Sequence, residues 1–308
     1  FSDGLLSSLM FPPGALAQAV FPFAPHGDDF SILMTGSTTG YAYAEGDVWL
    51  NRPTMVTSGY MNFWDGAAGK FVLLHETGHA LGLKHPHDGG GSNRPTFTDI
   101  GLSLTRQIEF NQGDLFDVDA FTMMSYNDDV SWNTWEGDPA TLMPLDVLAL
   151  QALYGPNPRT NAGDSTHLIL HDGVYATTWD AGGNDVIDGS LSDAGWLMFL
   201  ETPIDDPLLS PHMQRVALAV PLTGGGLDET TLKWVFDAEN AYGSQFDDVL
   251  VGSRLSNFLS GNAGHDIVVG LGGDDTLFGF GGLDTLSGDD GNDWISGGDG
   301  DDDLTGGE

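Results

Sequence analysis

The sequence predicts two domains, an α+β domain at residues 1–158 followed by an all-β parallel roll at residues 159–308. Three observations lead to this prediction. The length of 308 residues fits two domains of roughly 100–200 residues each. Residues 71–86 read as a helix and a turn that carry three histidines. From Gly243 to Gly306 a glycine recurs at every ninth position, which is typical of a stacked repeat.

The composition narrows the classes of partner. The chain has 9 Lys and Arg against 45 Asp and Glu, a formal net charge of −36, so nucleic acid and anionic membranes are not expected to bind it. Such a surface collects cations instead. The lack of Cys excludes disulfides, Cys-based zinc sites and thiol nucleophiles. No apolar run approaches the roughly 18 residues of a membrane span, and Phe1–Ala24 does not have the basic start of a signal peptide.

The first domain contains a candidate zinc site. On a helix, His75 and His79 lie one turn apart on the same face, so both imidazoles can reach one ion. Gly82 has no Cβ and can leave the helix with a positive φ, which turns the chain so that His85 becomes a third ligand. Three imidazoles and an open position are typical of one catalytic Zn²⁺, with Glu76 placed to deprotonate a zinc-bound water that attacks a carbonyl. The alternative is an ordinary amphipathic helix with surface histidines.

A second segment, Thr122–Tyr126, adds to this site. Met124 can form a soft, apolar floor beneath the imidazoles, and the phenol of Tyr126 can bind zinc or donate a hydrogen bond to an oxyanion. The alternative is a Met and a Tyr buried in an ordinary turn. A helix is predicted at Leu142–Tyr154, where Gly155 and Pro156 end it and mark the domain boundary.

The second domain opens with a single repeat unit and then short strands. Residues Trp179–Asp188 have the repeat pattern, with Asp185 in register. Strands are predicted at 196–200, 214–220 and 231–236, and we expect them to flank or cap the roll.

The nonapeptide repeat itself has three phased positions. Position eight is always aliphatic and is expected to stack inward, forming a core that no single turn could bury alone. Position six is Asp in every turn except at Asn257, and position four is Gly from Gly264 onward. An acidic, solvated tail is the alternative, but such tails do not keep an aliphatic phase.

Successive half-turns, each one repeat long, alternate between the two sides of the roll, so aspartates two repeats apart face each other. They would repel unless a hard cation with oxygen ligands lay between them, and this is the pattern of a calcium-binding nonapeptide. Several structural Ca²⁺ ions are therefore predicted, with weaker or missing binding at Asn257. The predicted ligands are Asp185, Asp248, Gly264, Asp266, Gly273, Asp275, Gly282, Asp284, Gly291, Asp293, Gly300 and Asp302.

The motifs together resemble one enzyme family. The pattern HExxHxxGxxH with a Met-containing turn is similar to the metzincin proteases. Pro86 after the third histidine, the MSY sequence ending at Tyr126, the helix at 142–155 and the calcium roll all resemble the serralysins within that group. The resemblance implies a metzincin-type α+β protease domain followed by the roll. It also implies a secreted bacterial zinc endopeptidase, exported by the type I route, monomeric and acting on protein or peptide substrates.

Site roles follow from the same resemblance. His75, His79 and His85 would be zinc ligands, Glu76 the general base, and Tyr126 an additional zinc ligand that swings away to stabilise the tetrahedral intermediate. The segment Tyr41–Asn51 resembles an edge strand that binds extended substrates by strand addition.

The resemblance has two departures and leaves two alternatives. His75 lies much closer to the start of the chain than the zinc helix does in family members, and the chain stops inside a repeat at Glu308, so a shortened, processed or fragmentary chain is expected. One alternative is a non-catalytic calcium-binding scaffold or adhesin-like protein with a vestigial protease half. The other is a structural zinc site. The intact Glu76 favours an enzyme.

Overall fold

The computed structural model describes residues 68–83, 85–86, 119–125, 139–202, 215–228 and 230–307, together with the backbone of three short strands before residue 51. It divides into two compact units, Phe1–Tyr154 and Gly155–Glu308. The sequence-based boundary lies after residue 158.

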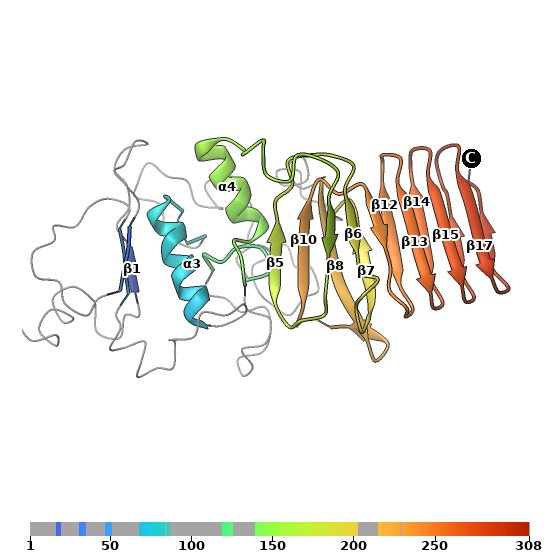
Figure 1. Cartoon of the computed structure of the whole chain (residues 1–308), viewed down its shortest axis with the longest axis horizontal. Coiled ribbons are helices and arrows are strands. Elements are labelled where there is room, and N and C mark those ends of the chain that lie inside the picture. Colours follow the sequence, from blue (N-terminus) through green and yellow to red (C-terminus); the bar gives the residue numbers. More distant parts are fainter. Residues whose placement is uncertain are drawn as a thin grey trace, which may run out of the picture. The chain divides into compact units, whose positions relative to one another are not determined.

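In its described residues, the first unit contains a small sheet and two helices (Figure 1). The strands are β1 (Ala17–Ala19), β2 (Ser31–Met34) and β3 (Asp47–Leu50), in the order β1-β3-β2. Strand β3 pairs antiparallel with β1 and parallel with β2. The helices are α3 (Ala68–Ala80) and α4 (Pro144–Tyr154).

This sheet corrects one expectation. The resemblance implied an edge strand at Tyr41–Asn51, but β3 has hydrogen-bonded partners on both sides. The prediction is therefore wrong for residues 47–50, because an inner strand has no free backbone edge to offer a peptide. The rest of that segment lies outside the described residues.

Helix α3 ends in a glycine motif that places the next residues. Gly82 has φ = +103°, as the sequence predicted. The amide of Leu83 donates to the carbonyl of Gly78 and that of Gly82 to the carbonyl of His79, both at 2.9 Å. This pair of bonds is a Schellman motif, which reverses the chain after the last helical turn.

Helix α4 begins with a clear N-terminal signature. Met143 precedes the first helical residue, Pro144, whose fixed φ suits that position. Asp146, at the third helical position, accepts a hydrogen bond from the amide of Met143 at 2.9 Å, in the manner of a capping box. The helix ends at Tyr154, and Gly155 follows with φ = +82°.

The second unit is a roll made of two sheets (Figure 1). One has nine strands in the order β18-β16-β14-β12-β7-β8-β10-β5, with β9 paired to β8, and the other has six in the order β17-β15-β13-β11-β6-β4. The strands of the first sheet are β5 (Tyr175–Thr178), β7 (Gly195–Phe199), β8 (Val216–Thr223), β9 (Gly226–Leu227), β10 (Leu232–Phe236), β12 (Val249–Ser253), β14 (Ile267–Leu271), β16 (Thr285–Ser287) and β18 (Asp303–Thr305). Those of the second are β4 (Thr166–Leu168), β6 (Val186–Asp188), β11 (Asn240–Tyr242), β13 (Phe258–Ala263), β15 (Thr276–Gly281) and β17 (Trp294–Asp299).

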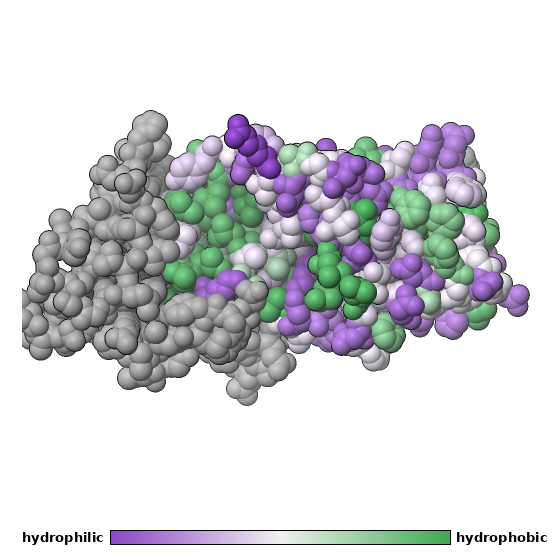
Figure 2. Space-filling view, viewed as in Figure 1, coloured by the Kyte–Doolittle hydropathy of each residue, from purple (hydrophilic) through white to green (hydrophobic). Residues whose placement is uncertain are grey.

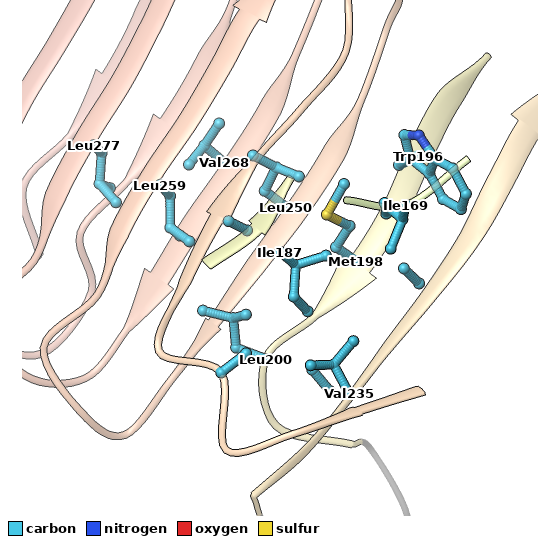
Figure 3. Close-up of a cluster of buried hydrophobic side chains, with 14 of the residues drawn as sticks. Ile169, Ile187, Trp196, Met198, Leu200, Val235, Leu250, Leu259, Val268 and Leu277 are labelled. Atoms are coloured by element: carbon cyan, nitrogen blue, oxygen red, sulfur yellow. The ribbon is translucent and has the colours of Figure 1, made fainter. Parts of the chain in front are cut away.

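The predicted parallel roll is confirmed by the register of these strands. From β11 onward, each strand pairs in parallel with the next strand of its own sheet, and paired residues lie two repeats apart, as in Val268↔Leu286 and Leu259↔Leu277. Except for Leu304 in the last turn, which is 46% exposed, the aliphatic position-eight residues therefore stack between the sheets, as predicted (Figure 3). Five of them are fully buried: Leu250, Leu259, Val268, Leu277 and Leu286.

The strands before residue 243 continue these sheets. Strand β7 pairs in parallel with β12, and β6 pairs in parallel with β11. The predicted strands at 196–200, 214–220 and 231–236 correspond to β7, β8 and β10. Trp196 and Met198 of β7 are fully buried and extend the core of the roll (Figure 3).

Hydrophilic residues are widespread on the surface of the roll. On the side shown in Figure 2 they are interrupted by hydrophobic areas. Among the described residues, no helix has the length and apolar character needed to span a membrane.

Replacing Leu277 by Ala should lower the free energy of unfolding by about 2–5 kcal/mol, because it opens a cavity in the stacked core. Leu283→Ala is the matched control, since Leu283 is 56% exposed whereas Leu277 is 0% exposed. The control should change stability by less than about 0.5 kcal/mol. Urea unfolding of the calcium-loaded proteins measures both, and equal effects would contradict the stacked-core description.

Candidate metal centres

Three histidines converge in the first unit. The Nε2 atom of His85 lies 3.1 Å from Nε2 of His75 and 3.0 Å from Nε2 of His79. His75 and His79 come from successive turns of α3, and the Schellman motif after that helix brings His85 back to them. His75 is 4% exposed and His79 7% exposed. The sequence-predicted ligand set is thus brought together.

Backbone carbonyls hold the imidazole rings of His75 and His79 at their Nδ1 atoms. Nδ1 of His75 lies 2.7 Å from the carbonyl oxygen of Met123, and Nδ1 of His79 lies 3.0 Å from that of Leu83. A carbonyl oxygen only accepts hydrogen bonds, so each Nδ1 must carry the proton. In a neutral imidazole the Nε2 lone pair then points at the other histidines, which is the tautomer that binds a metal.

The chemistry of this donor set fits a zinc ion. With Zn–N bonds of about 2.0–2.1 Å, tetrahedral ligands lie about 3.3 Å apart, close to the separations seen here. Lone pairs held this close repel each other unless a proton or a cation lies between them. Three nitrogen ligands also leave a fourth position for water or substrate.

The other predicted residues of this site are placed in part. Glu76 is half-buried on α3, directly after His75. Met124 is 1% exposed and packs on the same helix, since a Cβ added at Gly78 would lie 2.6 Å from its sulfur. Tyr126 lies outside the described residues.

Asp146 is a residue that the sequence analysis did not single out. It is 2% exposed, and its carboxylate accepts hydrogen bonds from the hydroxyl of Thr122 at 2.6 Å and the amides of Met123 and Met143, each at 2.9 Å. Burial raises its pKa to about 6, against the opposing effect of these three bonds. Its position near the helix start signals capping, but only the structure shows its partners in the turn at 119–125.

The repeat aspartates form the predicted ladder. In each of five cases one carboxylate oxygen accepts a hydrogen bond of 2.7–3.0 Å from the amide of the residue two repeats earlier. The accepting residues are Asp266, Asp275, Asp284, Asp293 and Asp302. The second oxygen, Oδ2, is buried and has no hydrogen-bond partner in Asp266, Asp275, Asp284 and Asp293. A buried carboxylate oxygen without a partner is costly, and a hard cation removes that cost.

The predicted glycine ligands lie against the backbone of the turn two repeats earlier. A Cβ added at Gly282, Gly291 or Gly300 would collide with the carbonyl oxygen of the glycine two repeats earlier. The backbones of successive turns can therefore approach this closely only because these positions are glycine.

The first two turns of the repeat are built differently. Both oxygens of Asp248 accept backbone hydrogen bonds, from Trp196 and Ser244. At Asn257, the side-chain oxygen accepts from the amide of Ser253 at 2.7 Å, and the side-chain nitrogen donates to the carbonyl of Glu239 at 2.7 Å. At this turn the carbonyl oxygen of Glu239 therefore accepts a hydrogen bond from the side-chain amide of Asn257.

A further cluster lies at the start of the roll. His167, Asp180 and Asp185 have potential ligand atoms within 4.8 Å of one another. Nε2 of His167 lies 2.9 Å from a carboxylate oxygen of Asp180. Asp185 is fully buried, its Oδ2 has no hydrogen-bond partner, and desolvation raises its pKa. The predicted ligand Asp185 therefore lies close to His167, and the sequence did not indicate this proximity.

Comparisons with known proteins concern the calcium repeat and the whole chain. The model of the RTX calcium-binding nonapeptide repeat matches residues 242–277 and 278–308. Metalloprotease AprA of Pseudomonas entomophila is 30% identical over 275 residues, which is 77% of this chain and 50% of that protein. Serralysin C of Dickeya chrysanthemi is 33% identical over 160 residues, 42% of this chain and 31% of that protein.

This chain resembles the serralysin-type metalloproteases. Serralysin of Photorhabdus luminescens is a further relative, 28% identical over 249 residues, covering 73% of this chain and 45% of that protein. The chain thus spans half or less of the length of these serralysin-type relatives.

The pKa values of the ladder predict how the calcium-free protein responds to pH. Burial raises the pKa of Asp248 to about 7 and that of Asp266 and Asp275 to about 6, from an ordinary value of 3.8, and the neighbouring carboxylate two repeats on adds to each. Because these pKa values are higher in the folded roll than in the unfolded chain, protonation of the three aspartates favours folding. This stabilisation is complete below about pH 4 and is lost as the pH rises through about 6–7.

Without calcium, circular dichroism should therefore show more β structure near pH 4.5 than near pH 8. With calcium, the β signal should persist near pH 8, because the ionised carboxylates then bind the ion. A calcium-free chain with more β structure near pH 8 than near pH 4.5 would contradict this description of the ladder.

Proposed function

We propose that this protein is a secreted zinc endopeptidase of the serralysin type whose roll is stabilised by calcium. One observation carries the proposal. The Nε2 atoms of two histidines, both on rings anchored through Nδ1, lie 3.0 and 3.1 Å from that of a third, beside a glutamate on the same helix. The name of Metalloprotease AprA and the likeness to serralysins support a peptidase over other zinc chemistry.

The residues have separate tasks in this proposal. His75, His79 and His85 would hold one Zn²⁺. When bound, this ion lowers the pKa of a coordinated water to about 7 and polarises a carbonyl group. Glu76 would accept the proton of the attacking water as general base and pass it to the leaving nitrogen of the peptide. Tyr126 would be a further zinc ligand and would donate a hydrogen bond to the developing oxyanion.

Calcium would act on the roll. The buried Oδ2 atoms of Asp266, Asp275, Asp284 and Asp293 support cation binding between successive turns. Because the calcium-free carboxylates repel each other and their buried Oδ2 atoms lack hydrogen-bond partners, calcium binding would shift the equilibrium toward the folded roll. This coupling suits a protein that leaves a calcium-poor cell unfolded, by the type I route, and folds in a calcium-rich medium as a monomer. Its substrates would be proteins or peptides.

Glu76→Gln should lower the cleavage rate of casein at least roughly a hundredfold while one zinc ion per chain is retained, because the general base is lost and the ligands are kept. Cleavage is measured with calcium and zinc present, and zinc is counted by atomic emission. Glu201→Gln is the matched control, since Glu201 pairs with Arg254 in the other unit, and its activity should equal that of the native chain.

Retained activity in the Glu76→Gln variant would exclude the assigned base. A folded, zinc-loaded native chain that cleaves nothing would favour the alternative of a non-catalytic calcium-binding scaffold.

Asn257→Asp should raise the calcium concentration needed to fold the roll. The change removes the amide that donates to the carbonyl of Glu239 and leaves a carboxylate facing an oxygen. The midpoint of a calcium titration followed by circular dichroism measures this. Asn157→Asp is the control, since Asn157 is exposed, and its midpoint should not move. An unchanged midpoint for Asn257→Asp would mean that the amide does not take the place of a cation.

A further inference from the structure

We propose that Asp146 is a positioning residue for the zinc ligand His75, acting through the backbone of Met123. The inference rests on the zinc site of the proposed function. Asp146 itself touches neither the three histidines nor any reacting atom in this assignment, and its role is to fix the carbonyl that orients one ring.

The connection consists of two hydrogen bonds to one residue. The amide of Met123 donates to Oδ2 of Asp146 at 2.9 Å, and the carbonyl of Met123 accepts from Nδ1 of His75 at 2.7 Å. Met123 is 0% exposed, so no water competes for either group. The position of its carbonyl is therefore set from one side by the carboxylate, and it sets the ring of His75 on the other.

The carboxylate is itself tightly held. Its other bonds come from the hydroxyl of Thr122 and the amide of Met143, the residue before α4. The amide of Leu145 also donates to the carbonyl of Phe121 at 3.0 Å. Two adjacent residues of α4 thus attach the turn at 119–125 to the start of the helix.

The two anchored zinc ligands differ in their support. His79 is oriented by the carbonyl of Leu83, which follows closely in the sequence and is fixed by the Schellman motif of the same helix. His75 is oriented by the carbonyl of Met123, which lies far away in the sequence. Of these two rings, that of His75 therefore takes its carbonyl partner from a turn that α4 holds in place. Burial of an ionised carboxylate is unfavourable in itself, and three charge-assisted hydrogen bonds compensate for it at this position.

Asp146→Asn tests the inference in the full chain with calcium present. The amide keeps the size of the side chain but can accept through one oxygen only, so at least one of the donors from Thr122, Met123 and Met143 loses its partner. We expect the Kd for zinc, measured by competition with a chelating dye, to rise about 10–100-fold. The visible absorption of the cobalt-substituted site should also change, because one imidazole is no longer held in place.

Asp188→Asn is the matched control, and both its zinc Kd and its cobalt spectrum should equal those of the native chain. Thr122→Val removes one hydrogen-bond donor to the same carboxylate. It is the second test variant if Asp146→Asn does not fold. Its zinc Kd should rise about 3–10-fold. A role confined to global stability would move neither the zinc Kd nor the cobalt spectrum of a folded variant.

The outcomes separate this inference from the proposed function. If the native chain binds one zinc tightly and a folded Asp146→Asn or Thr122→Val binds it equally well, the positioning role is overturned and the zinc site stands. If the native chain binds no zinc, the proposed function fails and this inference fails with it.

Discussion

Electron-rich atoms meet at close range in both units of this protein, and the repulsion between them is the constraint on which the structure depends. In the first unit, the imidazole nitrogens of His75 and His79 lie 3.1 and 3.0 Å from that of His85, because one helix and its Schellman turn bring them together. In the second, a buried carboxylate oxygen without a hydrogen-bond partner recurs along the roll. A proton between the imidazole nitrogens can relieve the first arrangement, and a cation of suitable type between the ligands relieves both. Nitrogen ligands with an open position suit zinc, and oxygen ligands suit calcium.

The roll and the histidine site carry this constraint in different ways. The roll is a repeat, so each turn contacts mainly its neighbours, and its hydrophobic column of Leu and Val stabilises only turns that are already aligned. Alignment brings the aspartates together, so hydrophobic stacking and charge repulsion oppose each other until calcium binds. At the turn of Asn257 the side chain is uncharged, and its amide donates a hydrogen bond to a backbone carbonyl, so no charge repulsion opposes the stacking there. The histidine site instead depends on distant support, since the carbonyl beneath His75 belongs to a turn that is attached to α4 through Asp146.

The sequence predicted the features that follow from local periodicity. The spacing of His75 and His79, the positive φ at Gly82 and the two-repeat register of the roll each follow from helix or repeat geometry, and the structure has them. Features that depend on contacts between distant segments could not be predicted in this way. They include the bonds of Asp146 to the turn at 119–125 and the approach of His167 to Asp180. The edge strand inferred from the family resemblance was wrong at residues 47–50, because strand order within a sheet is not encoded in the strand's own pattern.

The proposed peptidase activity depends on zinc held by the three histidines. Its most direct test is casein cleavage at constant calcium, first after zinc has been removed by a chelator and then during titration with zinc. Cleavage should be lost without zinc and should recover fully at one equivalent per chain. Cleavage that persists in the zinc-free chain, or that does not return at one equivalent while the chain stays folded, would contradict it.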